Sequence, residues 1–164
     1  MKKGDQKSTE KKSPPPAISN RKARFSYHIL DTFEAGIVLK GPEVKSLRGG
    51  KASLQDSFAR VENGEVFLHQ MHILPYTFTH HEDLSPTRTR KLLLHRTQIK
   101  KLSGKVQEKG LTLVPLEVFF NEKGIAKVNI ALAKGKRGPD KREDIKKRDV
   151  EREARREFRS QTKF

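Results

Sequence analysis

Short apolar-rich segments, separated by turn residues, run along the middle of the chain, and in the last two of them apolar and polar residues alternate with the period of two that is typical of strands. The segments expected to be strands are residues 25–30, 36–40, 57–62, 65–70, 111–120 and 125–133. Asn63 and Gly64 lie between the third and the fourth, and both tolerate the positive φ angles of a two-residue hairpin turn. Residues 121–124 separate the last pair. The pattern therefore predicts two β-hairpins.

Two further stretches have the pattern of short helices. Residues 42–50 begin with Pro42, which suits the first helical turn because its missing N–H costs nothing there, and Gly49 suits the left-handed position that ends a helix. Residues 96–109 repeat apolar side chains at helical spacing and are followed by Gly110, a residue that often ends helices.

Six or more short strands and two or three helices, in mixed order, predict a mainly β fold. The connections do not form repeated strand–helix–strand units, and closing the sheet on itself removes exposed strand edges. We therefore expect a small antiparallel β-barrel, closed or nearly closed, with helices over its ends.

The composition divides the chain into a compact middle and two polar ends. Among its 164 residues 33% are hydrophobic and 34% are charged, which is a low apolar share for a chain packed along its whole length. Residues 1–19 are rich in Lys, Ser and Pro and are expected to form a disordered basic lead-in. Residues 20–133 are the predicted barrel domain, and residues 134–164 are a basic C-terminal tail.

The tail combines a linker with a segment of good helix formers. Two glycines and a proline fall in residues 134–139, and acid-before-base pairs four residues apart follow at Glu143–Lys147, Asp144–Arg148 and Glu151–Arg155. Each pair contributes roughly 0.2–0.5 kcal/mol, which does not offset the cost of nucleating an isolated helix. We predict a tail that is disordered when free and helical when bound; the alternative is a solvated charged helix without a partner.

The formal net charge of +16 predicts an anionic partner. Residues 1–24 carry a net +6, residues 25–133 a net +4 and residues 134–164 a net +6. Such a chain is drawn to nucleic acid, because binding releases the counterions condensed on phosphates. An anionic membrane surface, or solubility without a fixed partner, remains the alternative from charge alone.

The absence of cysteine excludes disulfides and cysteine-ligated zinc, and no apolar run approaches the roughly 18 residues of a membrane span. We expect a cytoplasmic protein without a membrane segment or a secretory signal.

The histidines do not form a convincing metal or catalytic site. In a strand, His69 and His72 would point to opposite faces, and the donors in residues 80–83 are expected to lie in a wet loop without a zinc spacing. No paired acid and base, phosphate loop or nucleophile elbow is recognisable. We therefore expect no metal, no cofactor and no enzyme activity. Residues 87–91, by contrast, alternate Thr with Arg before an apolar run, a pattern that suits phosphate oxygens.

Six blocks in order resemble the SsrA-binding protein family, and their spacing matches from residue 20 to about residue 149. The blocks are NRKAR (20–24), FEAGI (33–37), GPEVKSLR (41–48), PTRTRKLLL (86–94), AKGK (133–136) and DKR (140–142). Many family members have Trp in the place of Pro42 and His in the place of Pro139, so stacking by those rings is not available here.

The resemblance implies an oligonucleotide-binding-like barrel that binds the tRNA-like part of transfer-messenger RNA, at its elbow. It implies that the RNA enters the empty A site of a stalled ribosome, with elongation factor Tu bound through the charged RNA. The tail then occupies the decoding centre and the mRNA channel, so that the ribosome is rescued and the nascent peptide receives a degradation tag. The protein is expected to be a monomer.

Matching positions supply the expected contacts. Asn20, Glu34, Leu93 and Lys127 match family positions that contact the RNA, and Lys134 with residues 140–142 matches the start of the functional tail. The complete set of expected RNA-binding residues is Asn20, Lys22, Arg24, Glu34, Lys45, Arg48, Arg88, Arg90, Lys91, Leu93, Lys127 and Lys134. The expected ribosome-contacting residues of the tail are Lys136, Arg137, Asp140, Lys141, Arg142, Ile145, Lys146, Lys147 and Arg148.

Three alternatives stay open at this point. Leu93 could equally be a plain core residue. The chain could be a constitutive structural protein of the ribosome, which would be present on most ribosomes and not enriched on stalled ones. It could also be a small RNA-processing enzyme, which would leave cleavage products.

Overall fold

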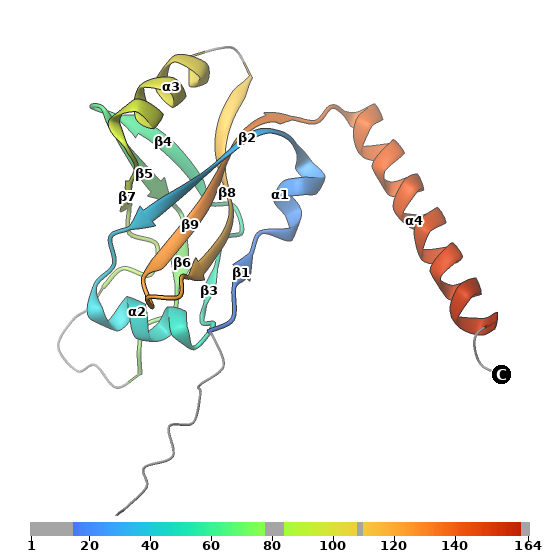
Figure 1. Ribbon diagram of the computed structural model, residues 1–164, viewed down its shortest axis with the longest axis horizontal. Coiled ribbons are helices and arrows are strands. Elements are labelled where there is room, and N and C mark those ends of the chain that lie inside the picture. The colour runs from blue at the N-terminus through green and yellow to red at the C-terminus, as the bar shows by residue number, and fades with distance from the viewer. Residues whose placement is uncertain (1–14, 78–83, 108–109, 162–164) are drawn as a thin grey trace, which may run out of the picture.

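The computed structural model describes residues 15–77, 84–107 and 110–161, which form nine strands and four helices (Figure 1). The strands are β1 (Ile18–Ser19), β2 (Tyr27–Ile37), β3 (Ala52–Ser53), β4 (Phe58–Glu62), β5 (Glu65–His69), β6 (His72–Ile73), β7 (Arg90–Leu93), β8 (Leu111–Phe120) and β9 (Ala126–Gly135). The helices are α1 (Arg21–Ser26), α2 (Gly41–Arg48), α3 (Arg96–Val106) and α4 (Gly138–Gln161).

Six strands close into an antiparallel barrel. Each strand pairs with the next in the order β8-β4-β5-β7-β2-β9, and β9 pairs again with β8 along most of its length. The short strand β1 adds to β8, while β3 and β6 form a separate two-stranded sheet. Helices α2 and α3 lie at opposite ends of the barrel, and α4 projects away from it (Figure 1). The expectation of a mainly β, closed antiparallel barrel with helices over its ends is confirmed.

The barrel interior is filled by the inward face of every strand. From β9, Val128, Ile130 and Leu132 are at most 1% exposed, and Leu68 and Leu92 meet them from β5 and β7. Each such side chain contributes roughly 1.5–3 kcal/mol by leaving water. The alternation read from residues 125–133 therefore reports a real packed face, as predicted.

A second apolar cluster forms on the outside of the barrel, under α1. Ala131 and Ala133 of β9 are fully buried although they lie on the outer face of the strand, and Ala23 of α1 covers them with Val114 of β8. Short side chains on the strand allow a helix to approach closely. This cluster holds α1 against the wall of the barrel.

The first hairpin and the start of α2 follow the sequence pattern, but the end of α2 does not: Gly49 has a φ of −79°, and the left-handed residue is Gly50, with a φ of 69°. Strands β4 and β5 pair across Asn63 and Gly64, whose φ angles are 50° and 76°, as the two-residue turn requires. Pro42 lies in the first turn of α2. Helix α3 ends at Val106, earlier than the predicted residue 109, and Gly110, with a φ of 85°, comes directly before β8.

The N-terminal part of the barrel differs from the prediction. Residues 25 and 26 belong to α1, and a single strand, β2, replaces the two strands predicted over 25–30 and 36–40. The intervening polar residues stay in the strand because they alternate outward, and a bulge between Ile29 and Asp31 resets the register. In addition, Ile18 and Ser19 of the predicted lead-in pair with β8.

None of the helices formed by the described residues is both apolar enough and long enough to cross a membrane.

Candidate nucleic-acid interface

Three outward-facing positions form a row across neighbouring strands. Gly36 of β2 pairs with Leu93 of β7 on one side and with Lys127 of β9 on the other. Leu93 is 54% exposed, which contradicts the alternative that it is a core residue. A Cβ atom at Gly36 would lie 3.3 Å from the Leu93 Cβ. The missing side chain therefore leaves Leu93 lying flat over the centre of the row.

Glu34 extends this row by one step along β2. Its Oε1 lies 3.2 Å from the Lys127 Nζ, and the Glu34 side chain is 55% exposed. In the adjacent row, the amide of Asn129 donates to Glu117 at 2.7 Å. We call the set of Glu34, Gly36, Leu93 and Lys127 the barrel-wall surface. It offers an exposed apolar side chain, a cation and hydrogen-bond acceptors close together.

A basic groove continues from this surface toward α3. It has a volume of about 820 Å³ and lies between α3 and the β4–β5 turn. Leu93 and Lys91 line one side, and Arg96 and Lys100 of α3 line the other. Lys91 forms an exposed ion pair with Glu65. Sequence reasoning missed Arg96 and Lys100, although both fall on the polar side of a predicted amphipathic helix, which is the pattern that indicates their exposure.

Arg90 is not an interface residue, and the prediction that it binds RNA is wrong. The side chain is fully buried, and its Nε donates to Glu43 at 2.9 Å. Its remaining N–H groups donate to three carbonyl oxygens, those of Met71, Pro86 and Arg88. A guanidinium whose donors are used inside the protein has none for a phosphate.

Arg88 and Glu43 complete the same buried cluster. The Arg88 Nε donates to Glu43 at 2.9 Å, and Arg88 is only 25% exposed. Burial of Glu43 would raise its pKa, but hydrogen bonds from Arg88 and the Lys40 N–H, with the charge of Arg90, outweigh burial and hold that pKa below its ordinary value. The cluster joins α2 to the loop before β7. Arg88 therefore has a structural role in addition to any contact with RNA.

Asn20 is largely engaged within the protein. Its Oδ1 accepts from the Ala23 N–H at 3.1 Å, which caps α1. Its amide nitrogen donates to the carbonyl oxygens of Leu54 at 3.2 Å and Pro115 at 3.1 Å. Both amide hydrogens are therefore used to attach α1 to the barrel.

The other expected RNA-binding cations lie in two groups away from the barrel-wall surface. Lys22, Arg24 and Lys134 are exposed around α1 and the end of β9. Lys45 and Arg48 are exposed on α2, where the Lys45 ammonium lies 5.2 Å from the Tyr76 ring and the Arg48 guanidinium 5.6 Å from the Phe120 ring. The structure thus brings together Glu34, Leu93, Lys127 and Lys91, and separates them from these two groups.

The tail leaves the barrel beside α1. The Lys136 N–H donates to the Ser26 carbonyl at 2.9 Å, and within α4 the Arg148 guanidinium lies 5.0 Å from the Phe25 ring. Ile145 is 46% exposed, and the other described cations of this segment are exposed as well: Arg137, Arg142, Lys146 and Lys147. Asp140 and Lys141 belong to the first turns of α4, but their side chains lie outside the described part.

Within the described ranges, no three side chains among His, Asp and Glu come together in a way that could hold a metal ion. The His80–Asp83 cluster lies outside the described residues.

A closed antiparallel barrel with a cationic wall and a basic helical extension defines a class of protein, the small nucleic-acid-binding barrels. Within that class the chain belongs to the SmpB family, since the family model described as "SmpB protein" matches residues 17–160. The resemblance read from the six sequence blocks is confirmed.

Relatives extend over nearly the whole chain. The SsrA-binding protein of Moorella thermoacetica is 58% identical over 144 residues, 88% of this chain and 93% of that protein. The SsrA-binding protein of Desulforamulus reducens is 52% identical over 96% of this chain and 98% of that protein. A solved structure described as "tmRNA-SmpB: a journey to the center of the bacterial ribosome" matches with a TM-score of 0.65 and 52% identity, over 79% of this chain and 94% of that one.

Proposed function

We propose that this protein binds the tRNA-like part of transfer-messenger RNA and carries it into the empty A site of stalled ribosomes, in the cytoplasm. The observation that carries the proposal is the match to the solved structure described as a tmRNA-SmpB structure of the bacterial ribosome. The two chains are 52% identical, and the match covers 94% of the chain in that structure. The constitutive ribosomal protein and the RNA-processing enzyme are not favoured by any feature of the described fold.

The barrel-wall surface supplies the chemistry for a folded RNA. The exposed Leu93 offers an apolar face for an unstacked base, and Lys127 neutralises a phosphate. Glu34 accepts from a base or a 2′-hydroxyl once Lys127 has turned to the RNA. The groove with Arg96 and Lys100 adds two phosphate contacts beside it.

The tail supplies the second half of the function. In this proposal residues 20–133 grip the RNA, and residues 134–164 enter the decoding centre and the mRNA channel. Exposed cations along α4, with Ile145, would face ribosomal RNA there. The protein acts as a carrier and not as a catalyst, so the RNA is unchanged after incubation with it.

Substitutions on the barrel-wall surface test the proposal. Leu93→Ala removes an apolar contact with a base and is expected to lower affinity for the tRNA-like RNA by about 4- to 12-fold, since the side chain is 54% exposed and burying about half of a leucine contributes about 0.8–1.5 kcal/mol. Lys127→Ala is expected to weaken binding and to reduce the slope of log affinity against log salt by about one phosphate contact. Filter binding or fluorescence anisotropy at several salt concentrations measures both.

Lys123→Ala is the matched control, because it removes an exposed cation from the β8–β9 turn without touching the barrel-wall surface. All three changes are at exposed or partly exposed side chains, so thermal unfolding should be nearly unaltered. If Lys123→Ala weakens binding as much as Lys127→Ala and Leu93→Ala has no effect, the RNA does not bind this surface.

A further inference from the structure

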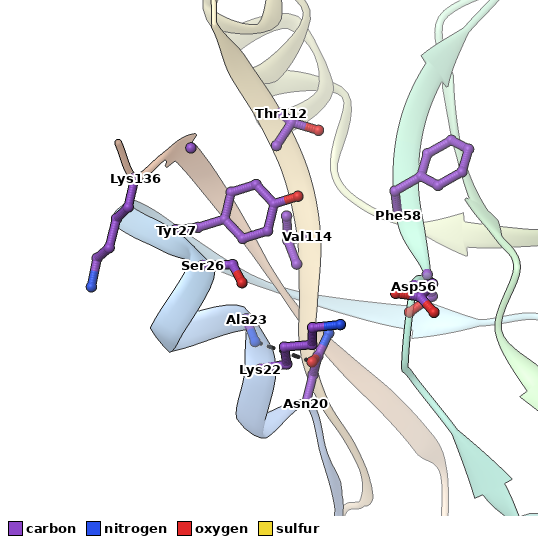
Figure 2. A pocket seen from close by; sticks show the side chains of 12 residues that line it. Asn20, Lys22, Ala23, Ser26, Tyr27, Asp56, Phe58, Thr112, Val114 and Lys136 are labelled. Carbon is purple, nitrogen blue, oxygen red and sulfur yellow. Dashed lines mark hydrogen bonds between the residues drawn. The ribbon is translucent and has the colours of Figure 1, made fainter. Parts of the chain in front are cut away.

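A second concave site lies at the opposite end of β2 from the barrel-wall surface. It is a pocket of about 690 Å³ between α1 and β4, with β8 behind it (Figure 2). Tyr27 and Gly36 are nine residues apart on one extended strand, so the two sites are separated by about 30 Å. One RNA group of base size cannot fill both.

Two aromatic rings and a carboxylate form the walls of this pocket. In Figure 2, Tyr27 stands on one side of the opening and Asp56 on the other, with Phe58 beside Asp56 and its ring turned away from Tyr27. Phe58 already stacks on His69, with ring centroids 5.1 Å apart and an interplanar angle of 11°. Tyr27 packs with its body against the cluster under α1. The Tyr27 ring is thus a fixed platform, whereas the Phe58 ring is already occupied by its stacking on His69.

Polar groups converge on the pocket without partners in the described structure. Among the described residues, none forms a hydrogen bond or ion pair with the Asp56 carboxylate, the Tyr27 hydroxyl or the Thr112 hydroxyl. Most other carboxylates of the barrel are paired, as Asp31 is with Lys105 and Glu117 with Asn129. Cations stand at the rim, where Lys22 is exposed and the Lys136 Nζ donates to the Arg24 carbonyl at 3.1 Å.

This combination selects the class of ligand. A ring platform favours a flat π-system, and lysines at the rim favour phosphates attached to it. A carboxylate repels an acidic peptide and accepts from two adjacent N–H donors. Among the four RNA bases, guanine presents such a pair on its Watson–Crick edge, the N1–H and the N2 amine, whereas adenine and cytosine present one amine beside an acceptor.

We propose that this pocket holds an unpaired guanine of RNA, with its ring against Tyr27 and its N1–H and N2 amine donating to Asp56. The inference rests on the proposed function in that the ligand is RNA, and it adds a contact remote from the barrel-wall surface. Gly135 and Lys136 line the same pocket. The base is therefore bound where the chain leaves the barrel for α4, and it would fix the direction in which the tail starts.

The first experiment uses fluorescein-labelled pentanucleotides that differ at the central base: UUGUU, UUAUU and UUIUU. The wild-type protein is expected to bind the guanine oligonucleotide at least tenfold more tightly than the adenine one. Inosine keeps N1–H but lacks the amine, and it should fall between them. Equal affinities for the three would overturn the proposal.

Asp56→Asn is the informative variant. Asp56 has a φ of 59°, and Asn tolerates that left-handed conformation as readily as Asp, so the backbone of the pocket is retained. The amide replaces one acceptor by a donor, so the preference for guanine should disappear. Glu122→Gln, at an exposed carboxylate in the β8–β9 turn and outside both proposed RNA sites, is the control and should keep the preference. A guanine preference that survives Asp56→Asn would also overturn the proposal.

The source of the guanine is found by chemical protection. Kethoxal modifies the N1 and N2 atoms of unpaired guanines, so the bound base should be protected by the wild-type protein and not by Asp56→Asn. Probing the tRNA-like RNA alone, and then stalled ribosomes carrying the complex, separates transfer-messenger RNA from ribosomal RNA. If the wild-type protein binds no RNA, the proposed function is refuted. If it binds RNA but no guanine is protected in an Asp56-dependent way, this inference alone is refuted.

Discussion

Glu43 shows how one residue can hold several parts of the chain together. It is 5% exposed and accepts hydrogen bonds from the Lys40 N–H, Arg88 and Arg90. These partners come from the start of α2 and from the segment that enters β7, more than forty residues further along. The carboxylate therefore fixes α2 across the end of the barrel.

Replacing Glu43 by Gln is expected to lower the free energy of unfolding by about 3–5 kcal/mol, because Arg90 would be left buried without its counter-charge. The pKa of Glu43 is held below its ordinary value of 4.5 by its hydrogen bonds and the charge of Arg90, which outweigh the opposing effect of burial. Its contribution is thus fully present above about pH 4.5 and is lost as the pH falls below that value.

Urea unfolding at pH 7 and at pH 3 to 4 measures both effects, and the stability difference between the wild type and the Gln variant should become smaller as the pH falls. Glu65→Gln is the control, because its pair with Lys91 is exposed and contributes less than about 1 kcal/mol. Equal losses in the two variants at pH 7 would refute the role given to Glu43.

For single residues, the sequence indicated which stretches are basic but not which of their side chains are buried and which are exposed. Arg90 and Lys91 are adjacent cations in a basic block, yet one is buried and the other exposed, because strand alternation sends them to opposite faces of β7. The phase of that alternation is set by the pairing of β7 with β5 and β2, which lie far away in the sequence. Leu93 is exposed for the same reason.

Among the elements, the hairpins and the helices α2 and α3 could be predicted, because their turn and cap residues are local signals. Helix α1 could not. It has six residues and one buried side chain, Ala23, and its cap Asn20 is held by carbonyls of Leu54 and Pro115. Helix α1 is therefore stabilised by tertiary contacts and not by local sequence signals. The sequence predicted two strands in place of β2, because the outward-facing polar residues in its middle resemble a loop.

Helix α4 gives a prediction at the scale of the element. Its ion pairs are exposed, as in Glu151–Arg155 at 2.6 Å, and it meets α1, where Arg148 lies over the Phe25 ring. Such interactions contribute a few tenths of a kcal/mol each. A peptide of residues 138–161 is therefore expected to show little helix by circular dichroism in low-salt buffer and to become helical with stalled ribosomes. Strong helicity of the peptide alone would contradict folding on binding.

At the scale of the whole molecule, we expect RNA binding to depend on the barrel and peptide tagging to depend on the tail, so that truncation affects one property without the other. A chain ending at Arg137 is expected to bind the tRNA-like RNA with nearly unchanged affinity, because α4 supplies none of the barrel-wall residues. Tagging of nascent peptides on stalled ribosomes should be lost. Anisotropy and an in vitro tagging assay measure the two properties. If truncation abolishes RNA binding, the two parts do not act separately.

The attachment of the tail to β9 has a mechanical consequence. β9 is hydrogen-bonded on both sides, to β2 and to β8, up to Lys134, and α4 begins a few residues beyond it. A pull along the tail would load both rows of bonds in shear, where many must break at once. When movement of the ribosome exerts force on the tail, the segment between β9 and α4 would bend first, and the barrel would stay folded.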